Sequence, residues 1–302
     1  MPAQYSLKCL SQEPRRAVAL TQDEFDNIRS AKKLLLQLLS FEDKFDILLE
    51  NYIEFEQELL LLSTRRMLSP NISYSEGQGF RHLLNRRLIN LLSSARLYVD
   101  QTKHDIGGFE QCVPGLKNAL DALFSNEYDN KLPYRSMEAL RNFTQHRDLP
   151  IQGIKFCSSR EQFDTGTEYS FRVAPHLVLQ ELEGDGGLKR SVLDELKVRG
   201  ANYPLLPLVR GYIESMGLIH VSVRANLAPW PDSWNEVIER AMALATEGTT
   251  ETIFGVYMIS FDQDTHETER IALFKELYQR VKELQEKNSV LGSLSKRFVS
   301  SR

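Results

Sequence analysis

One short segment of this chain combines a cation, an amide and an imidazole. Residues 140–150 read Leu-Arg-Asn-Phe-Thr-Gln-His-Arg-Asp-Leu-Pro, so Arg141, Asn142 and His146 precede a proline. An arginine guanidinium can hold a phosphate through paired hydrogen bonds, and an imidazole gains or loses a proton near neutral pH. These two groups would suffice to cleave RNA without a metal ion, which is the sharpest chemical hypothesis that the sequence offers.

Helical geometry predicts how these side chains are arranged. At ~100° per residue, Asn142 and His146 lie on one face, where the amide can hydrogen-bond the ring and fix its tautomer. Arg141 lies roughly 140° around the helix from His146. The apolar residues Met137, Leu140 and Phe143 point elsewhere and are expected to be buried. His146 is therefore expected on the outer side, where a second copy of the protein would supply the cleft that catalysis needs.

A simpler interpretation of the same residues stays open. Arg141 and Arg147 are then solvated cations, and His146 is a histidine at a helix C-terminus that complements the helix dipole. In that case the segment carries no chemistry.

Four helices are expected before the motif ends. Apolar residues recur at three- and four-residue steps over 22–68, with a possible break near Ser40, which resembles an N-cap when paired with Asp43. Residues 67–79 are expected to form a loop. Further helices are expected at about 79–104, 115–124 and 134–150, the last bounded by Pro133 and Pro150. Residues 1–150 thus predict an antiparallel four-helix bundle, with 1–21 as an N-terminal arm.

The chain after residue 150 predicts a smaller mixed α/β region over 151–287. Alternation predicts a strand at 167–173, and an apolar run predicts a stronger one at 252–261. Helices are expected at 188–198, 205–223, from Asp232 to Ala245, and at 265–287, with a turn at 183–187. Residues 288–302 are small, polar and basic and are expected to form a flexible tail. The predicted fold class is mainly α.

Composition limits the classes of partner. The chain has 302 residues, 26% of them charged, and a formal net charge of −4. Any contact to RNA must therefore come from a local basic patch. Cys9, Cys112 and Cys157 form no CxxC pair, which argues against a zinc ribbon or a disulfide framework. No secretory signal and no run of ~18 apolar residues is present, so we expect a cytoplasmic protein without a membrane span.

Two further clusters were weighed as sites. The second helix carries basic residues that, with Arg147 after the motif, are candidates for RNA backbone contacts: Arg81, Arg86, Arg87, Arg96, Lys103 and His104. The favoured alternative is a solvated face opposite the leucine stripe. A second cluster, from Asp262 to Glu269, could ligate a metal, but Thr265 followed by acidic residues is typical of a helix start. We therefore expect no metal site and no cofactor.

The segment Arg141-Asn142-Phe143-Thr144-Gln145-His146 resembles the signature of the HEPN superfamily, which is Arg, a polar residue, three to five residues and His. The resemblance covers about residues 22–150 and implies a HEPN-like helical bundle. It further implies a homodimer with a composite ribonuclease site, in which Arg141 holds the scissile phosphate, His146 is general acid or base, and Asn142 orients it. A toxin or defence effector with a protein inhibitor or antitoxin would follow. The alternative is a non-catalytic dimerisation or sensing module that binds a partner or nucleotide.

Overall fold

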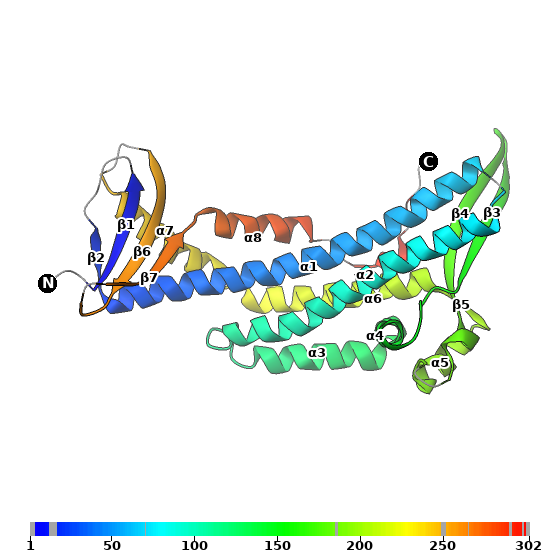
Figure 1. Cartoon of the computed structure of the whole chain (residues 1–302), viewed down its shortest axis with the longest axis horizontal. Coiled ribbons are helices and arrows are strands. Elements are labelled where there is room, and N and C mark those ends of the chain that lie inside the picture. The colour runs from blue at the N-terminus through cyan, green and yellow to red at the C-terminus, as the bar shows by residue number, and fades with distance from the viewer. Residues whose placement is uncertain are drawn as a thin grey trace. The chain divides into compact units, whose positions relative to one another are not determined.

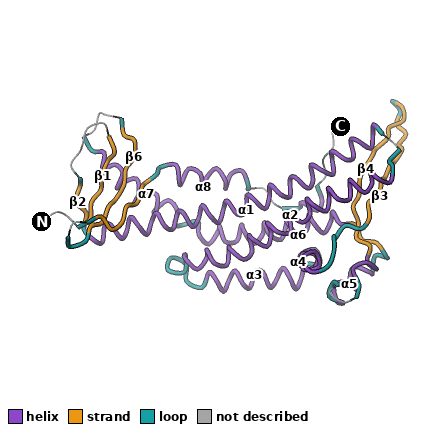
Figure 2. Tube along the Cα trace, viewed as in Figure 1, coloured by secondary structure: helices purple, strands orange, loops and turns teal. Residues whose placement is uncertain are grey.

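The computed structural model of the chain describes residues 4–11, 17–69, 71–184, 187–248, 252–264, 266–289, 292–297 and 299. Long helices dominate it, which confirms the mainly α prediction (Figures 1 and 2). The helices are α1 (Gln22–Leu68), α2 (Tyr74–Ile106), α3 (Leu116–Asn130), α4 (Leu132–His146), α5 (Arg190–Lys197), α6 (Leu205–Leu227), α7 (Pro231–Thr246) and α8 (Glu276–Lys287). The strands are β1 (Tyr5–Ser11), β2 (Val18–Leu20), β3 (Gly153–Phe163), β4 (Gly166–Val178), β5 (Asn202–Pro204), β6 (Ile253–Phe261) and β7 (Glu267–Leu273).

Contacts divide the chain into two compact units, each built from separate segments. The first unit contains Met1–Asp43, His104–Lys117 and Val223–Ser289, and the second contains Lys44–Lys103, Asn118–Ser222 and Val290–Arg302. The sequence alone places a division near residue 150 instead, and that division stays a prediction.

The first unit contains a four-stranded antiparallel sheet in the order β2-β1-β6-β7. The N-terminal arm supplies β1, which pairs with β6 from Tyr5 opposite Ser260 to Ser11 opposite Ile253. Helix α7 packs on β1 and β6. The described part of the segment expected to be an arm therefore supplies an inner strand, β1, and an edge strand, β2, of this sheet.

Residues 265–287 do not form the single helix that the sequence predicts. Residues 267–273 form β7, which pairs with β6 and places Leu273 opposite Val256, and only Glu276–Lys287 is helical. The Asp262 carboxylate accepts hydrogen bonds from the backbone N–H groups of Asp264 and His266, which closes the β6–β7 turn. Hydrogen bonding to the neighbouring strand overrides the local helical pattern. Thr265, the expected N-cap, lies outside the described residues.

The second unit is a helical core with a three-stranded sheet in the order β3-β4-β5. Its core joins helices that are distant in sequence: the rings of Phe45 on α1 and Tyr98 on α2 are 5.4 Å apart, and those of Tyr134 on α4 and Tyr212 on α6 are 5.3 Å apart. Helix α6 is thus part of the helical core. Strands β3 and β4 form a hairpin that turns at Gly166, whose φ of +131° favours glycine.

The long helices α1 and α2 each differ from the sequence prediction. Helix α1 continues through Ser40 without a break. Helix α2 begins at Tyr74 because Ser73 and Glu76 form a capping box: the Glu76 carboxylate accepts from the Ser73 backbone N–H, and the Ser73 hydroxyl accepts from the Glu76 N–H. The capping box satisfies two N–H groups that a helix start would otherwise leave open.

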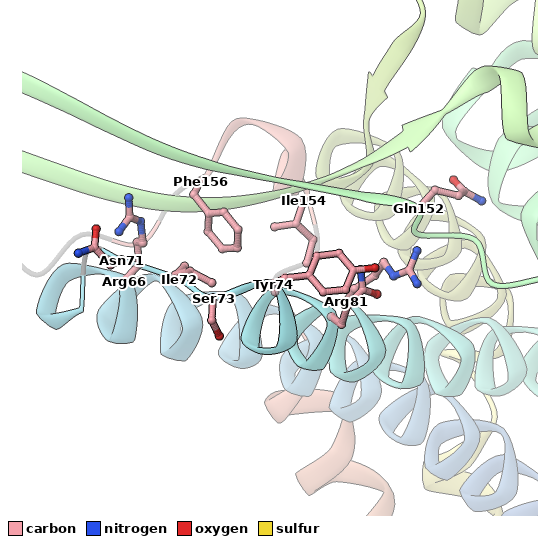
Figure 3. Close-up of a pocket in the computed structure, with 11 residues that line it drawn as sticks. Arg66, Asn71, Ile72, Ser73, Tyr74, Arg81, Gln152, Ile154 and Phe156 are labelled. Carbon is pink, nitrogen blue, oxygen red and sulfur yellow. The ribbon is translucent and has the colours of Figure 1, made fainter.

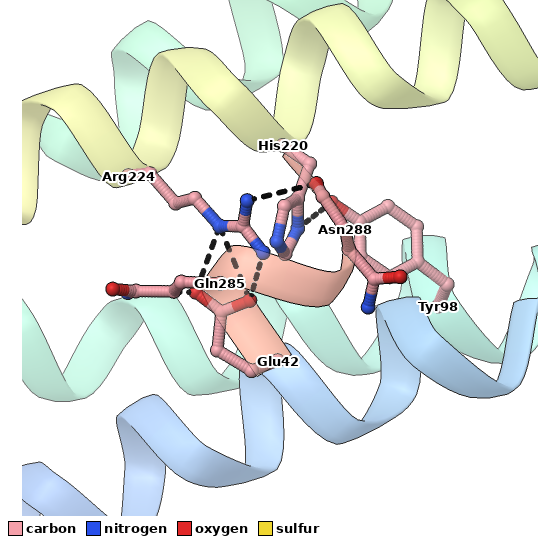
Figure 4. A network of polar contacts seen from close by, with 6 residues as sticks. All are labelled: Glu42, Tyr98, His220, Arg224, Gln285 and Asn288. Carbon is pink, nitrogen blue, oxygen red and sulfur yellow. Dashed lines mark hydrogen bonds and ion pairs between the residues drawn. The ribbon is translucent and has the colours of Figure 1, made fainter. Parts of the chain in front are cut away.

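Two enclosed polar clusters involve α6 (Figure 4). In the first unit, Arg224 binds the fully buried Glu42 carboxylate, which also accepts a hydrogen bond from Gln285. In the second unit, His220 is fully buried, and its Nδ1 lies 3.0 Å from the Tyr98 hydroxyl.

Candidate functional site

Helix α4 is held in the second unit by one apolar face. Its buried residues are Tyr134, Ser136, Met137, Leu140 and Phe143. The helix ends at His146, where the backbone N–H of Arg147 donates to the Phe143 carbonyl at 2.9 Å. The expected burial of Met137, Leu140 and Phe143 is confirmed, and it fixes which side of the last turn faces outward.

Two of the motif side chains, Asn142 and His146, lie on the outward side of that turn, and Arg141 lies at the edge of the buried face. Asn142 and His146 are exposed, and Arg141 is half-buried. Arg141 Nη1 donates a hydrogen bond of 3.0 Å to Asn142 Oδ1. In the part of the chain that the structure describes, no hydrogen bond joins Asn142 to the His146 ring. The amide therefore orients the guanidinium rather than the imidazole in this single chain.

The Arg141 guanidinium keeps hydrogen-bonding capacity. Its Nε is buried and has no hydrogen-bond partner among the described residues. A guanidinium has five N–H donors in a planar fork that matches a phosphate. Asn142 accepts from Nη1, so this contact sets the direction of the remaining donors.

Arg147 lies just beyond the helix end. Its guanidinium is 5.9 Å from the centre of the Phe143 ring. The guanidinium also lies next to Gly184, because a Cβ atom built on that glycine would be 3.3 Å from Arg147 Nη2. It is exposed. The side chain thus adds a second arginine close to the turn that carries His146.

Half of the expected basic residues of α2 are paired with acids: Arg87, Arg96 and Lys103. Arg87 forms ion pairs with Glu54 and Glu58 on α1, and Arg96 Nε lies 2.7 Å from Asp100. Arg86 is exposed, and the described residues give it no ion pair. This pairing is the pattern of a solvated face, while contacts of these residues to RNA stay a prediction.

Sequence reasoning missed a cavity in the second unit. It has a volume of about 520 Å³ and lies between the end of α1, the start of α2 and the start of β3. Arg66 and Arg81 line it together with Tyr74 and Phe156 (Figure 3). The sequence does show Arg66 and Arg81 on either side of Tyr74. It does not show that β3 contributes to the cavity, because β3 is mostly polar and exposed.

Metal ligation finds no support in the geometry. Within the described ranges, no group of three or more His, Cys, Asp or Glu side chains is arranged to hold a metal ion. The acidic residues after β6 form the hairpin turn described above.

Comparisons with family models, with curated proteins and with solved structures gave no match for this chain. Among the described residues, none of the helices combines the length and the apolar character needed to cross a membrane.

Proposed function

We propose that this protein is a metal-independent endoribonuclease of HEPN type, acting in the cytoplasm as a homodimer. One observation carries the proposal: the last turns of α4 carry the exposed His146 and the half-buried Arg141, whose guanidinium is held by Asn142. The free state of Cys9, Cys112 and Cys157 fits a reducing compartment.

The proposed reaction is an internal transfer. The RNA 2′-oxygen attacks the adjacent phosphorus, so a P–O2′ bond forms and the P–O5′ bond breaks. One His146 takes the proton from the 2′-hydroxyl, and the leaving 5′-oxygen receives a proton. Arg141 stabilises the negative charge on the non-bridging oxygens. The products are a 2′,3′-cyclic phosphate and a free 5′-hydroxyl, and no metal takes part.

A dimer completes the pair of proton carriers. A single chain supplies one exposed imidazole at this helix end, whereas the reaction needs a base and an acid on opposite sides of the phosphate. Two α4 ends facing each other across a two-fold axis would supply both. A protein inhibitor or antitoxin that covers this end would silence the enzyme, which fits a toxin or defence effector.

The test is cleavage of a labelled single-stranded RNA by the purified full chain in EDTA. The wild type should yield 2′,3′-cyclic phosphate ends, and His146→Ala should lower the rate about 10²–10⁴-fold. Arg141→Ala should behave similarly. His266→Ala, which removes another exposed histidine from the β6–β7 turn, is the matched control. No cleavage by the wild type, or full activity in His146→Ala, would refute the proposal.

A non-catalytic sensing module is the second candidate. The cavity that contains Arg66 and Arg81 favours it, because a ligand there could be bound without any use of His146. This candidate predicts equal behaviour of wild type, His146→Ala and Arg141→Ala in the RNA assay.

A further inference from the structure

The cavity between α1, α2 and β3 has the size of a ligand pocket. Its volume of about 520 Å³ falls within the range of small-molecule sites. Figure 3 shows Ile154 and Phe156 pointing from β3 toward the start of α2, with Arg66 and Arg81 toward opposite ends. All of the lining residues belong to the second unit.

The charge of the cavity is positive and uncompensated. Two arginines line it, and none of its described lining residues is acidic. Elsewhere in the same unit, Arg87 and Arg210 are neutralised by glutamates. Two arginines without an ion pair are notable in a chain whose net charge is −4. An anion is the ligand that two unpaired guanidinium groups favour.

The arginines also keep donors available. Arg81 Nε is buried without a hydrogen-bond partner among the described residues. Arg66 donates only a long hydrogen bond of 3.3 Å to the Ser69 carbonyl, and the described residues give neither arginine an ion pair. Neither guanidinium is therefore neutralised by the described residues.

The start of α2 is not the source of this anion affinity. The Glu76 carboxylate occupies it, and hydrogen bonds from Ser73 hold the pKa of that carboxyl below its ordinary value. Because Glu76 stays ionised beside the helix start, its charge offsets the helix dipole there. The positive character of the cavity therefore comes from Arg66 and Arg81.

Aromatic and apolar surface lies between the two arginines. The Phe156 ring is fixed by an edge contact to Phe80, with 6.2 Å between the ring centres, and the Arg66 guanidinium lies 6.0 Å from it. Tyr74 is 84% exposed and presents its ring to solvent at the cavity rim. Side-chain amides complete the lining: Asn71, Gln78 and Gln152. Aromatic rings, amides and arginines together are the groups that bind nucleobases and their phosphates.

The wall of the cavity is anchored to the helix that carries Arg81. Asn85 on α2 exchanges two hydrogen bonds of 2.9 Å with the backbone of Ile151. Gln152 follows directly and lines the cavity. The chain from His146 to Gln152 can span at most ~22 Å, so one RNA strand can reach both the end of α4 and this cavity.

We infer that this cavity binds a nucleotide unit of single-stranded RNA, with the base against Tyr74 and Phe156 and the flanking phosphates on Arg66 and Arg81. The choice of RNA as ligand rests on the proposed function. The site is a positioning site, because its residues hold the strand and take no part in the cleavage step.

The experiment measures binding of a fluorescein-labelled single-stranded RNA to the full chain by fluorescence anisotropy in EDTA. Every variant carries His146→Ala, so that the RNA stays intact. Arg66→Gln and Arg81→Gln should each weaken binding about 10-fold and lower the salt slope by ~0.7. Tyr74→Ala should weaken binding about 5- to 100-fold.

Matched controls lie close to the site but outside it. Arg65→Gln removes an exposed arginine adjacent to Arg66, and Tyr169→Ala removes an exposed tyrosine from β4. Both should bind as tightly as the parent. Duplex RNA should bind more weakly than the single strand, because its bases are not accessible.

Each outcome separates this inference from the proposed function. Equal binding by all variants would overturn the cavity site while leaving cleavage intact. Tight binding of adenosine monophosphate without binding of RNA would also overturn it, since the ligand would then be a free nucleotide. Binding that depends on Arg66 and Arg81, in a wild-type protein that cleaves no RNA, would support the cavity and refute the nuclease.

Discussion

Helices α4 and α6 each carry a histidine and an arginine near one end, and the structure treats the two pairs in opposite ways. On α6, His220 is fully buried and stacks on the Phe45 ring with 3.8 Å between the ring centres. Arg224 is bound to a buried glutamate. On α4, His146 is exposed and Arg141 is half-buried. The same residue types thus stabilise the fold in one helix and are free to meet a ligand in the other.

The apolar pattern of each helix explains the difference. Helix α6 is buried over most of its circumference, with Leu208, Val209, Ile213, Met216 and Ile219 all nearly inaccessible to solvent. Polar groups on such a helix must find partners inside the protein. Helix α4 has a single buried face, so its polar groups on the other side stay in water.

The largest effect is expected where α6 encloses a charge. Arg224→Leu removes the cation that compensates the buried Glu42 carboxylate, and it should lower the free energy of unfolding by about 3–5 kcal/mol. Urea unfolding followed by circular dichroism measures it. Adding Glu42→Leu to this variant should recover much of the loss, because the uncompensated charge is gone.

Arg240→Leu is the control for this prediction. Arg240 is 78% exposed and pairs with Glu236 on the surface of α7. Its loss should change the free energy of unfolding by less than about 1 kcal/mol. Equal effects of Arg224→Leu and Arg240→Leu would contradict the contrast between enclosed and exposed cations.

A smaller but still clear effect is expected at His220. His220→Ala removes the stack on Phe45 and leaves the Tyr98 hydroxyl without this partner, which should cost about 2–4 kcal/mol of unfolding free energy. Thermal unfolding would show it as a lower Tm. The exposed His82 on α2 gives a control, and a Tm loss in His82→Ala as large as in His220→Ala would count against the prediction.

How far the sequence predicts these environments depends on the range of the interactions. The bounds of α1 follow from a long apolar periodicity, and the inner face of α4 follows from Met137, Leu140 and Phe143. Both are local patterns. The pairing of Tyr5 with Ser260 is not local, so β1 escaped prediction. The sequence of β3 is mostly polar, so it lacks the apolar pattern that would predict a strand.

The candidate site shows the same limit. Helical spacing placed Asn142 and His146 on one outward side, which the structure confirms. Helical spacing did not decide whether the Asn142 amide binds the His146 ring or the Arg141 guanidinium. In the structure, Asn142 Oδ1 accepts a hydrogen bond from Arg141. The cavity was not predictable because Arg81 and Phe156 meet only after β3 folds back on α2.

A third histidine lies between the two extremes and should respond to pH. His176 is half-buried, and burial, with Lys155 as a second cause, lowers the pKa of its ring below the ordinary value. The folded state therefore binds the proton less readily than the unfolded state. Its stabilising contribution is complete above the unfolded pKa of about 6.5 and is lost as pH falls through the lowered folded value.

Thermal unfolding between pH 8 and pH 5 measures this effect. His176→Gln should flatten the part of the Tm decrease that falls below about pH 6.5. The change should be smaller than that of His220→Ala, because solvent screens a half-exposed ring. An unchanged pH dependence of the Tm in His176→Gln would show that other titratable groups cause the loss of stability at low pH.

The smallest effect on stability is expected at His146, and it separates the two helices most sharply. His146→Ala should change the free energy of unfolding by no more than about 0.5 kcal/mol, because the ring is exposed. The same variant is expected to lose RNA cleavage. Urea unfolding and the cleavage assay on one preparation test both statements. A stability loss above about 1 kcal/mol would mean that His146 supports the end of α4, and any activity loss would then report unfolding rather than chemistry.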